Sequence, residues 1–343
     1  MTVIVFTFAV LCFIVSGCSQ TVDDQPHKKP VDTHNLLGKK ILLVDSYHPE
    51  YVQSMLILNE IEKFAQKEKI ELQVVYLDEK HKKSDDLLRQ AAINAKNIID
   101  AWQPDVLIAA DDPASQYVVS EYYRDVSLPV VFVGVNWNVS QYGYPYKNVT
   151  GQIEIEFLKE LLSELRKYAK GTRLGFITGE TLTDRKVCNY YENDLKIEFF
   201  KKVFVNDFEE WKTAYLDLQN TVSILLVRNN AGIAGWDDGE AQKFVLENTN
   251  IPTGSISQNM APFVLINYSK VATEFGQYAV KTAYKILTGT PPSDIPISKN
   301  KQLQVYLNMP MAKKLNIVFP MNLIEQATFV EYGQADENYN DQY

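Results

Sequence analysis

Residues 129–152 read PVVFVGVNWNVSQYGYPYKNVTGQ, and the organisation of the whole chain follows from this stretch. It opens with a continuous apolar run, residues 129–135, of the length and composition of a strand buried on both faces. A polar, aromatic loop containing Asn136 and Trp137 comes next, and a second series of elements follows Asn148–Gly151. We therefore predict a strand end that contacts ligand, and a first crossing between two lobes at residues 148–151.

Apolar runs of strand length alternate with amphipathic helical stretches on both sides of this stretch. The strands expected are residues 41–44, 72–77, 105–110, 129–135, 173–178, 196–205, 222–227, 251–254, 263–267 and 303–308. The helices expected are about 51–69, 84–101, 112–123, 153–168, 184–193, 208–218, 237–247, 270–287 and 310–315. Such alternation predicts right-handed crossovers and parallel sheets. The fold class is therefore α/β, with two Rossmann-like lobes of parallel strands joined by a hinge of several crossings.

The long helix at 270–287 and the segment after it still need surfaces to cover, so we expect both to return across the hinge. Lobe 1 is then residues 40–150 plus about 269–298. Lobe 2 is residues 151–268 plus about 299–330. The polar residues 331–343 are expected to form a disordered tail.

The N-terminal residues indicate export. Residues 3–15 form an apolar core of the length found in signal peptides and too short to span a membrane. Small residues then lead into Cys18, as in a bacterial lipobox. We expect residues 1–17 to be a lipoprotein signal peptide and Cys18 to carry a lipid such as palmitate. Residues 18–39 would be a flexible tether, and the protein would face the periplasm or cell exterior, anchored to the bacterial membrane by lipid only.

Composition excludes several function classes. The net charge of −9 and the absence of a basic stretch with interleaved aromatic residues argue against nucleic-acid binding. Cys188 is the one cysteine outside the export signal, so no intrachain disulfide is expected, and no Cys/His spacing suits a metal. We expect no cofactor.

In open α/β sheets, ligands bind outside the carboxyl ends of the strands. The polar and aromatic residues that follow the predicted strands are therefore the candidate ligand-binding residues, with hydroxyl, amide, carboxylate and aromatic groups suited to a small polar or amphipathic solute. They are Ser46, Tyr47, Asp111, Asp112, Ser115, Asn136 and Trp137 in lobe 1, Gln152 just past the crossing, and Glu180, Thr181, Asn229, Asn230 and Gln258 in lobe 2. Each of these residue types also forms turns or caps helices, so no single residue is strong evidence for ligand binding. The recurrence of such residues after several strands in both lobes supports ligand binding for the set as a whole. Arg228 is the nearest cationic residue to these turns.

Catalytic signatures are missing from the sequence. There is no Gly-x-Ser-x-Gly elbow, no dinucleotide fingerprint after the first strand and no His-Glu-x-x-His motif. An exported α/β hydrolase using Ser46 or Asp112 remains an alternative, although the expectation is that the protein is not an enzyme.

Several segments resemble the substrate-binding proteins of ABC transporters with the type I periplasmic-binding fold, in the branch of tryptophan/tyrosine-type binding lipoproteins. The matching residues are Asp112–Gln116, Asn148–Gly151, Pro292–Pro296, Leu307–Asn308, Ala312–Ile317 and Pro320. The turn Asp111–Pro113 is more acidic than the family's small-residue and Thr-Pro turns, so no ligand is carried over from the family.

The resemblance implies a non-enzymatic receptor whose two lobes close over a small solute, with an amino acid or an aromatic metabolite among the candidates. Its partner would be an ABC permease, which receives the solute. The alternative partner is a membrane sensor, a kinase or cyclase that reads ligand occupancy from the same fold.

Overall fold

The structure, a computed structural model, describes residues 36–82 and 84–331. Several expected features lie outside the described residues. They are the signal peptide, the Cys18 lipid site, the tether up to residue 35 and the expected tail apart from its first residue. Within the described part of the chain, no helix is long and apolar enough to cross a membrane.

Six strands form one sheet in the order β11-β5-β4-β3-β1-β2, and every pairing in it is parallel. Their bounds are β1 (Lys40–Asp45), β2 (Glu71–Tyr76), β3 (Val106–Ala110), β4 (Val130–Asn136), β5 (Val149–Glu154) and β11 (Ser298–Lys299). The central strands β1, β3 and β4 are almost wholly buried. This burial on both faces explains why they are continuous apolar runs in the sequence.

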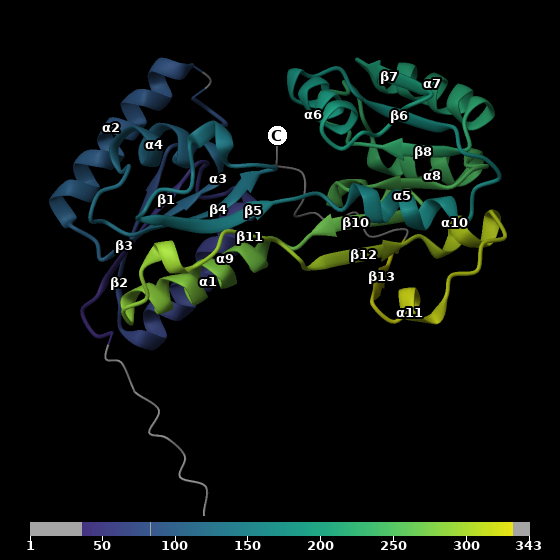
Figure 1. The fold of residues 1–343 in the computed structure, drawn as a ribbon. Coiled ribbons are helices and arrows are strands. Elements are labelled where there is room, and N and C mark those ends of the chain that lie inside the picture. The colour runs from purple at the N-terminus through teal and green to yellow at the C-terminus, as the bar shows by residue number, and fades with distance from the viewer. Residues whose placement is uncertain (1–35, 83, 332–343) are drawn as a thin grey trace, which may run out of the picture. The chain divides into compact units, whose positions relative to one another are not determined.

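Alternate residues of these strands belong to two different apolar cores. Residues such as Leu42 and Phe132 pack with α2 (Asp85–Trp102) and the helical segment α3 (Asp111–Pro113), η1 (Ala114–Val119) and α4 (Ser120–Tyr122). Residues such as Leu43 and Val131 pack with α1 (Val52–Glu68) and α9 (Ala272–Leu287), which lie side by side (Figure 1). Helices therefore cover both faces of this sheet, as in a doubly wound fold.

Seven strands form the other sheet in the order β13-β12-β10-β9-β8-β6-β7 (Figure 1). Their bounds are β6 (Leu174–Gly179), β7 (Lys201–Val205), β8 (Ile224–Val227), β9 (Thr253–Ser255), β10 (Ile266–Lys270), β12 (Leu303–Leu307) and β13 (Ala327–Phe329). The α-helices that accompany it are α5 (Leu158–Arg166), α6 (Leu182–Asn193), α7 (Phe208–Thr221), α8 (Asp238–Asn248), α10 (Met309–Lys314) and α11 (Met321–Ile324). Short 3-10 turns are η2 (Ser140–Tyr142), η3 (Gln258–Phe263) and η4 (Pro292–Asp294).

One pairing corrects the expectation of purely parallel sheets. β12 runs antiparallel to β10, whereas the other pairings of the seven-stranded sheet are parallel. Only three residues, 300–302, separate β11 from β12, so the chain enters β12 from the other sheet rather than through a helical crossover. Without such a crossover, nothing requires the strand to be parallel.

Polar side chains cap the N-termini of several of the expected helices, with one exception. The side chains of Ser84 and Asp207 accept hydrogen bonds from the backbone N–H groups of Leu87 and Glu210. A helix was expected from residue 112, at which Asp112 could serve as the cap, but the structure contradicts this role. The helical segment already begins at Asp111, and the Asp112 carboxylate accepts instead from the side chain of Asn136.

The expected strand at residues 196–205 is shorter than predicted. Lys196 has a positive φ of 58°, a conformation that interrupts an extended strand, and β7 begins only at Lys201.

The chain passes between the two sheets at residues 155–157, at residue 271 and at residues 300–302. The expected first crossing at residues 148–151 is wrong, because Val149–Glu154 is β5 and pairs along its length with β4. The stretch after it was expected to be helical from residue 153, but α5 begins at Leu158. α9 packs against α1 and against strands of the six-stranded sheet, while β12 returns to the seven-stranded sheet.

Candidate functional site

A cavity of about 920 Å³ lies where strand ends of both sheets meet. Its lining comes from the residues after β1, β3, β4, β5, β8 and β10, from the start of α1 and from one side of α6. Cavities of this size accommodate small organic ligands. Seven aromatic side chains line it, which are Tyr47, Tyr51, Trp137, Tyr142, Phe157, Tyr190 and Tyr268.

Asp111 is the buried acid at the end of β3. It is 4% exposed, and its φ of 70° is the left-handed conformation that Asp tolerates better than most residues. Gly134 on β4 leaves space for it, because a Cβ atom there would lie 3.3 Å from the Asp111 carboxyl carbon. The hydroxyl of Tyr47 donates to Asp111 Oδ1 over 3.4 Å. Two neighbouring strands thus hold this carboxyl at the cavity wall.

Asp112, beside it, is satisfied by neutral donors. Its Oδ2 accepts from the side-chain amide of Asn136 at 2.6 Å and from the backbone N–H of Asn136 at 3.2 Å. Its Oδ1 accepts from the hydroxyl of Tyr142 at 2.5 Å. Asp112 therefore fastens the loop after β4 to the end of β3.

Trp137 and Tyr190 form a parallel aromatic stack, with ring centroids 4.0 Å apart and an interplanar angle of 11°. Trp137 follows β4 of the six-stranded sheet and has a φ of 61°, whereas Tyr190 lies on α6 beside the seven-stranded sheet. The indole Nε1 is buried without a hydrogen-bond partner. Such an unpaired buried donor is uncommon and is found where a partner is supplied from outside the chain.

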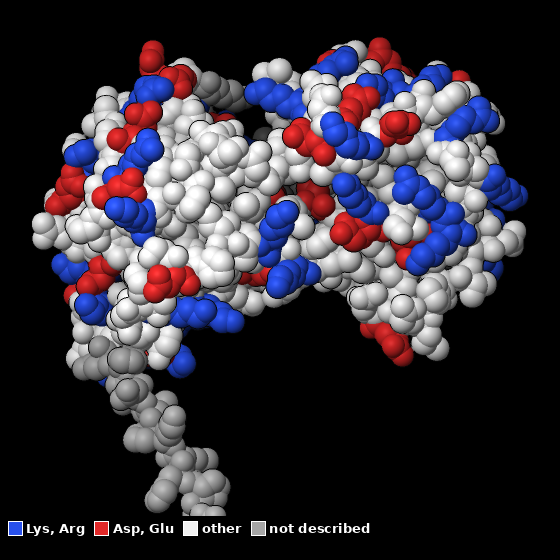
Figure 2. Space-filling model, in the orientation of Figure 1, with Lys and Arg blue, Asp and Glu red and all other residues white. Residues whose placement is uncertain are grey.

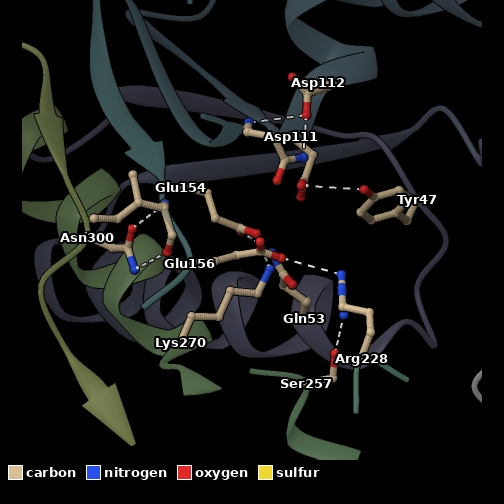
Figure 3. A network of polar contacts seen from close by, with 12 residues as sticks. Tyr47, Gln53, Asp111, Asp112, Glu154, Glu156, Arg228, Ser257, Lys270 and Asn300 are labelled. Carbon is tan, nitrogen blue, oxygen red and sulfur yellow. Dashed lines mark hydrogen bonds and ion pairs between the residues drawn. The ribbon is translucent and has the colours of Figure 1, made fainter. Parts of the chain in front are cut away.

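Two acidic residues at the first crossing are paired with cations from other strands (Figure 3). The Lys270 ammonium at the end of β10 forms an ion pair with Glu154, the last residue of β5. The Arg228 guanidinium, after β8, lies 3.4 Å from Glu156 and also donates to Ser257. Glu156 accepts in addition from the hydroxyl of Tyr191 at 2.7 Å.

The crossings are bonded to one another close to the cavity. Asn300 Oδ1 accepts from the backbone N–H of Ile155 at 2.7 Å, and its Nδ2 donates to the Ile155 carbonyl at 3.2 Å (Figure 3). The carboxylate of Glu274 on α9 accepts from the backbone N–H groups of Lys301 and Gln302. The first and third crossings thus share a hydrogen-bonded frame.

Burial decides the acidity of the carboxyl groups. Burial raises the pKa of Asp111 well above its usual value, and the nearby charge of Glu154 raises it further. Burial also raises the pKa of Glu154, against the opposing effect of Lys270. Behind them, burial raises the pKa of Asp45, which is 1% exposed. The largest cause of each shift is the same, the removal of the carboxyl group from water.

Of the residues predicted to bind ligand, Tyr47, Asp111, Asp112, Asn136, Trp137 and Gln258 line the cavity. They share a position at the carboxyl end of a strand or directly after it. Ser257 and Asn259, beside Gln258, also line it. That they contact a ligand stays a prediction.

The other predicted residues do not line the cavity, and all of them except Ser115 have a side-chain partner within the chain. The Ser46 hydroxyl, fully buried, donates to the Ala110 carbonyl and accepts from the Ala114 N–H. Ser115 is buried inside η1. Gln152 donates to Glu274 and to the Lys299 carbonyl. These three residues stabilise the six-stranded sheet and its surroundings.

The same holds for the predicted residues beside the seven-stranded sheet. Glu180 forms an ion pair with Arg185 at the surface, and Thr181 caps α6 by accepting from the Asp184 N–H. Asn229 donates to Asp184 at 3.0 Å, and Asn230 accepts from Asn259 at 2.7 Å. These four residues stabilise turns near the cavity, and their side chains do not line it.

Sequence reasoning missed Glu154, Glu156, Lys270 and Tyr190 as cavity residues. Glu154 and Glu156 are alternate acids in the run QIEIE, and this spacing of two residues was a signal for a strand end. The run was instead assigned to the start of a helix. Lys270 and Tyr190 carry no local signal, because the tertiary fold brings them to the cavity from other elements.

Comparisons with known proteins find a family model that matches one segment of the chain, and solved structures that share its fold. Residues 261–331 match the sequence model of the family described as ABC transporter substrate binding protein. No curated protein matches the chain. The expected type I periplasmic-binding fold, with two α/β sheets rich in parallel strands, is confirmed by the solved structures that match.

Three solved structures illustrate the similarity. The ligand-free, open structure of a substrate binding protein with adhesive properties from Clostridium difficile has a TM-score of 0.65 at 17% identity, over 85% of this chain and 99% of that one. The ABC domain in complex with L-Trp from Streptococcus pneumonia has a TM-score of 0.55 at 16% identity, over 86% and 100%. A periplasmic ribose ABC transporter structure from Conexibacter woesei has a TM-score of 0.51 at 13% identity, over 83% and 97%.

Proposed function

We propose that this chain, whose residues 261–331 match the family of ABC transporter substrate binding proteins, is an extracytoplasmic receptor that delivers a small solute to an ABC importer. The observation that carries the proposal is the cavity, in which strand ends of both sheets meet around one volume. A solute bound there contacts residues of both sheets. It therefore stabilises the conformation of the protein in which both sets of contacts are made. Ligand shifts the population of states only through its differential affinity for them.

Two features of the chain support this function over the alternatives. The Ser46 hydroxyl is buried and engaged by two backbone groups, so it is not placed to attack a solute in the cavity. Lys, Arg, Asp and Glu side chains are interspersed over the face shown in Figure 2, where no continuous basic surface suited to nucleic acid is seen.

Trp137→Ala is expected to weaken solute binding at least tenfold, about 1.4 kcal/mol, because the indole presents the largest aromatic surface at the cavity wall. A thermal-shift screen of amino acids, nucleosides, sugars and aromatic metabolites first identifies a solute, and calorimetric titration then compares the variants.

The matched control is Trp102→Ala, because Trp102 lies at the end of α2 and does not line the cavity. This variant should bind the solute like the wild type. If Trp137→Ala and Trp102→Ala bind equally well, the solute does not occupy this cavity. If no solute stabilises the wild-type protein, the receptor function itself is wrong.

We further propose that a lipid on Cys18 holds the receptor at the membrane surface. In cells fed labelled palmitate, the full-length chain should take up label and fractionate with membranes, whereas Cys18→Ala should do neither. The matched control is Cys188→Ala, because Cys188 is buried within α6, and this variant should be labelled like the wild type. Labelling that persists in Cys18→Ala would refute the anchor.

A further inference from the structure

The acidic groups of the cavity differ in how their charge is balanced. Glu154 is paired with Lys270, and Glu156 with Arg228. Asp112 accepts three hydrogen bonds from Asn136 and Tyr142. Asp111 has a single weak donor, the Tyr47 hydroxyl at 3.4 Å. Among residues 36–82 and 84–331, no lysine, arginine or histidine forms an ion pair with Asp111. Of the two buried carboxyl groups that line the cavity, Asp111 and Glu154, Asp111 is therefore the one without an ion pair.

The surroundings of Asp111 add negative charge. Asp45, Asp112 and Glu154 all act on it electrostatically in the same direction, and the charge of Lys270 opposes them. Oδ2 of the almost fully buried Asp45 has no hydrogen-bond partner. Figure 3 shows the Asp111 carboxyl turned toward the space that the carboxyl groups of Glu154 and Glu156 also approach. This part of the cavity therefore carries more acid than the chain's own cations neutralise.

Aromatic faces adjoin the same space. Tyr47, which donates to Asp111, packs against Tyr51 with ring centroids 4.6 Å apart, and both rings line the cavity. Trp137 lines it with an indole N–H that has no partner. Aromatic faces attract cations through the ring quadrupole, and the Lys80 ammonium already lies 4.7 Å from the Tyr47 ring centroid and 5.3 Å from that of Tyr51. Aromatic faces also bind planar or apolar groups, and the Trp137 ring has no such cation over it among the described residues. A positively charged nitrogen on an organic framework satisfies both features.

We propose that the cavity selects a solute with a positively charged nitrogen, which binds against Asp111 while the rest of the solute lies along Trp137 and Tyr190. This proposal rests on the receptor function proposed above. An ammonium ion supplies the cation that Asp111 lacks, so the ion pair offsets the loss of water around the carboxylate. A neutral polyol offers no positive charge to the Asp111 carboxyl group, and an anionic solute would be repelled by the acidic groups around it.

The experiment compares cationic probes with neutral and anionic ones of similar shape. Tryptamine, tyramine and choline form the cationic set. Indole-3-propionate, 4-hydroxyphenylpropionate and ribose form the other set. Calorimetric titration of the full chain at neutral pH should detect binding of at least one cationic probe. Its affinity should exceed that of its anionic counterpart, or of ribose in the case of choline, by tenfold or more.

Asp111→Asn is the decisive variant, because Asn also tolerates the left-handed backbone at this position and keeps the side-chain shape. It should lower the affinity for the bound cationic probe at least tenfold. Asp217→Asn is the matched control, because Asp217 pairs with Lys201 on the exposed side of α7, outside the cavity, and this variant should bind like the wild type.

The outcomes separate this inference from the receptor function. Binding of ribose or of a propionate, with affinity equal to or above that of the cationic probes, overturns the charge selection and leaves the receptor function intact. Unchanged affinity in Asp111→Asn also overturns it. If neither set binds, the selection proposed here is refuted, and the broader solute screen decides whether the receptor function is refuted as well.

Discussion

Gly151→Ala is expected to destabilise the protein by about 3 kcal/mol, the upper end of the usual range for overpacking a core. Gly151 lies in β5 opposite Phe132 of β4. A Cβ atom at this position would lie 2.2 Å from the Phe132 carbonyl oxygen and 2.4 Å from its ring carbon Cγ. A ring can turn aside, but the carbonyl belongs to the backbone of a central strand. The added methyl group would therefore push β5 away from β4.

The free energy of unfolding in urea measures this effect. The control is Gly239→Ala in the exposed first turn of α8, where the nearest atom to an added Cβ lies 3.4 Å away. Replacing that glycine should be neutral or raise stability by about 0.4–1 kcal/mol, since alanine restricts the unfolded chain. Equal stability of Gly151→Ala and the wild type would mean that β5 does not pack against Phe132 as described.

Lys270→Met is expected to lower the free energy of unfolding by about 3 kcal/mol at neutral pH, the lower end of the range for breaking a buried pair. The lower end applies because the Lys270 side chain is 32% exposed, whereas that of its partner Glu154 is 6% exposed. Without the ammonium group, the buried carboxylate keeps only the weak side-chain hydrogen bond from Gln53, at 3.4 Å.

The loss should depend on pH in a defined direction. Burial raises the pKa of Glu154 in the folded protein, so its contribution to stability is complete below its unfolded pKa, about 4.3, and is lost as pH rises through the folded pKa. Removing Lys270 raises the folded pKa further. The difference between wild type and Lys270→Met should therefore be small near pH 4 and grow toward pH 7.

A double-mutant cycle tests the cause. Lys270→Met combined with Glu154→Gln removes both charges, so this double variant should recover most of the stability lost at pH 7. If the single and double variants lose the same free energy, or if the loss is equal at pH 4 and pH 7, packing of the lysine stem rather than the charge of Glu154 explains the effect.

Much of the local structure could be predicted from the sequence. The apolar runs that became β1, β3, β4 and β8 are buried on both faces, so continuous hydrophobicity reports them directly. The helix starts at Ser84 and Asp207 depend on hydrogen bonds within one helical turn. Such caps can be predicted from the residue types at neighbouring positions in the sequence. β5 was missed because its sequence VTGQIE contains Gly151 and is not a continuous apolar run. The acids Glu154, its last residue, and Glu156, just after it, resemble a helix start.

The candidate site was predictable only in outline. The rule that ligands bind at the carboxyl ends of parallel strands led to Asp111, Asn136 and Trp137, which line the cavity. The same rule selected Glu180 and Asn229, which bond with Arg185 and Asp184 instead. A turn residue points toward a ligand or toward its own helix according to side-chain geometry, and residue type does not reveal which.

By itself, the sequence determined the alternation of strands and helices, the presence of two sheets and several of the strand ends that line the cavity. These features follow from periodicity and from contacts between residues close in the chain. Only the tertiary structure decided that β5 pairs with β4, that β12 runs antiparallel to β10, and that Lys270 meets Glu154. Those facts depend on partners more than a dozen residues away in the sequence. A local sequence pattern indicates that a strand needs a neighbouring strand, or a buried charge an opposite charge, but it does not indicate which residues supply them.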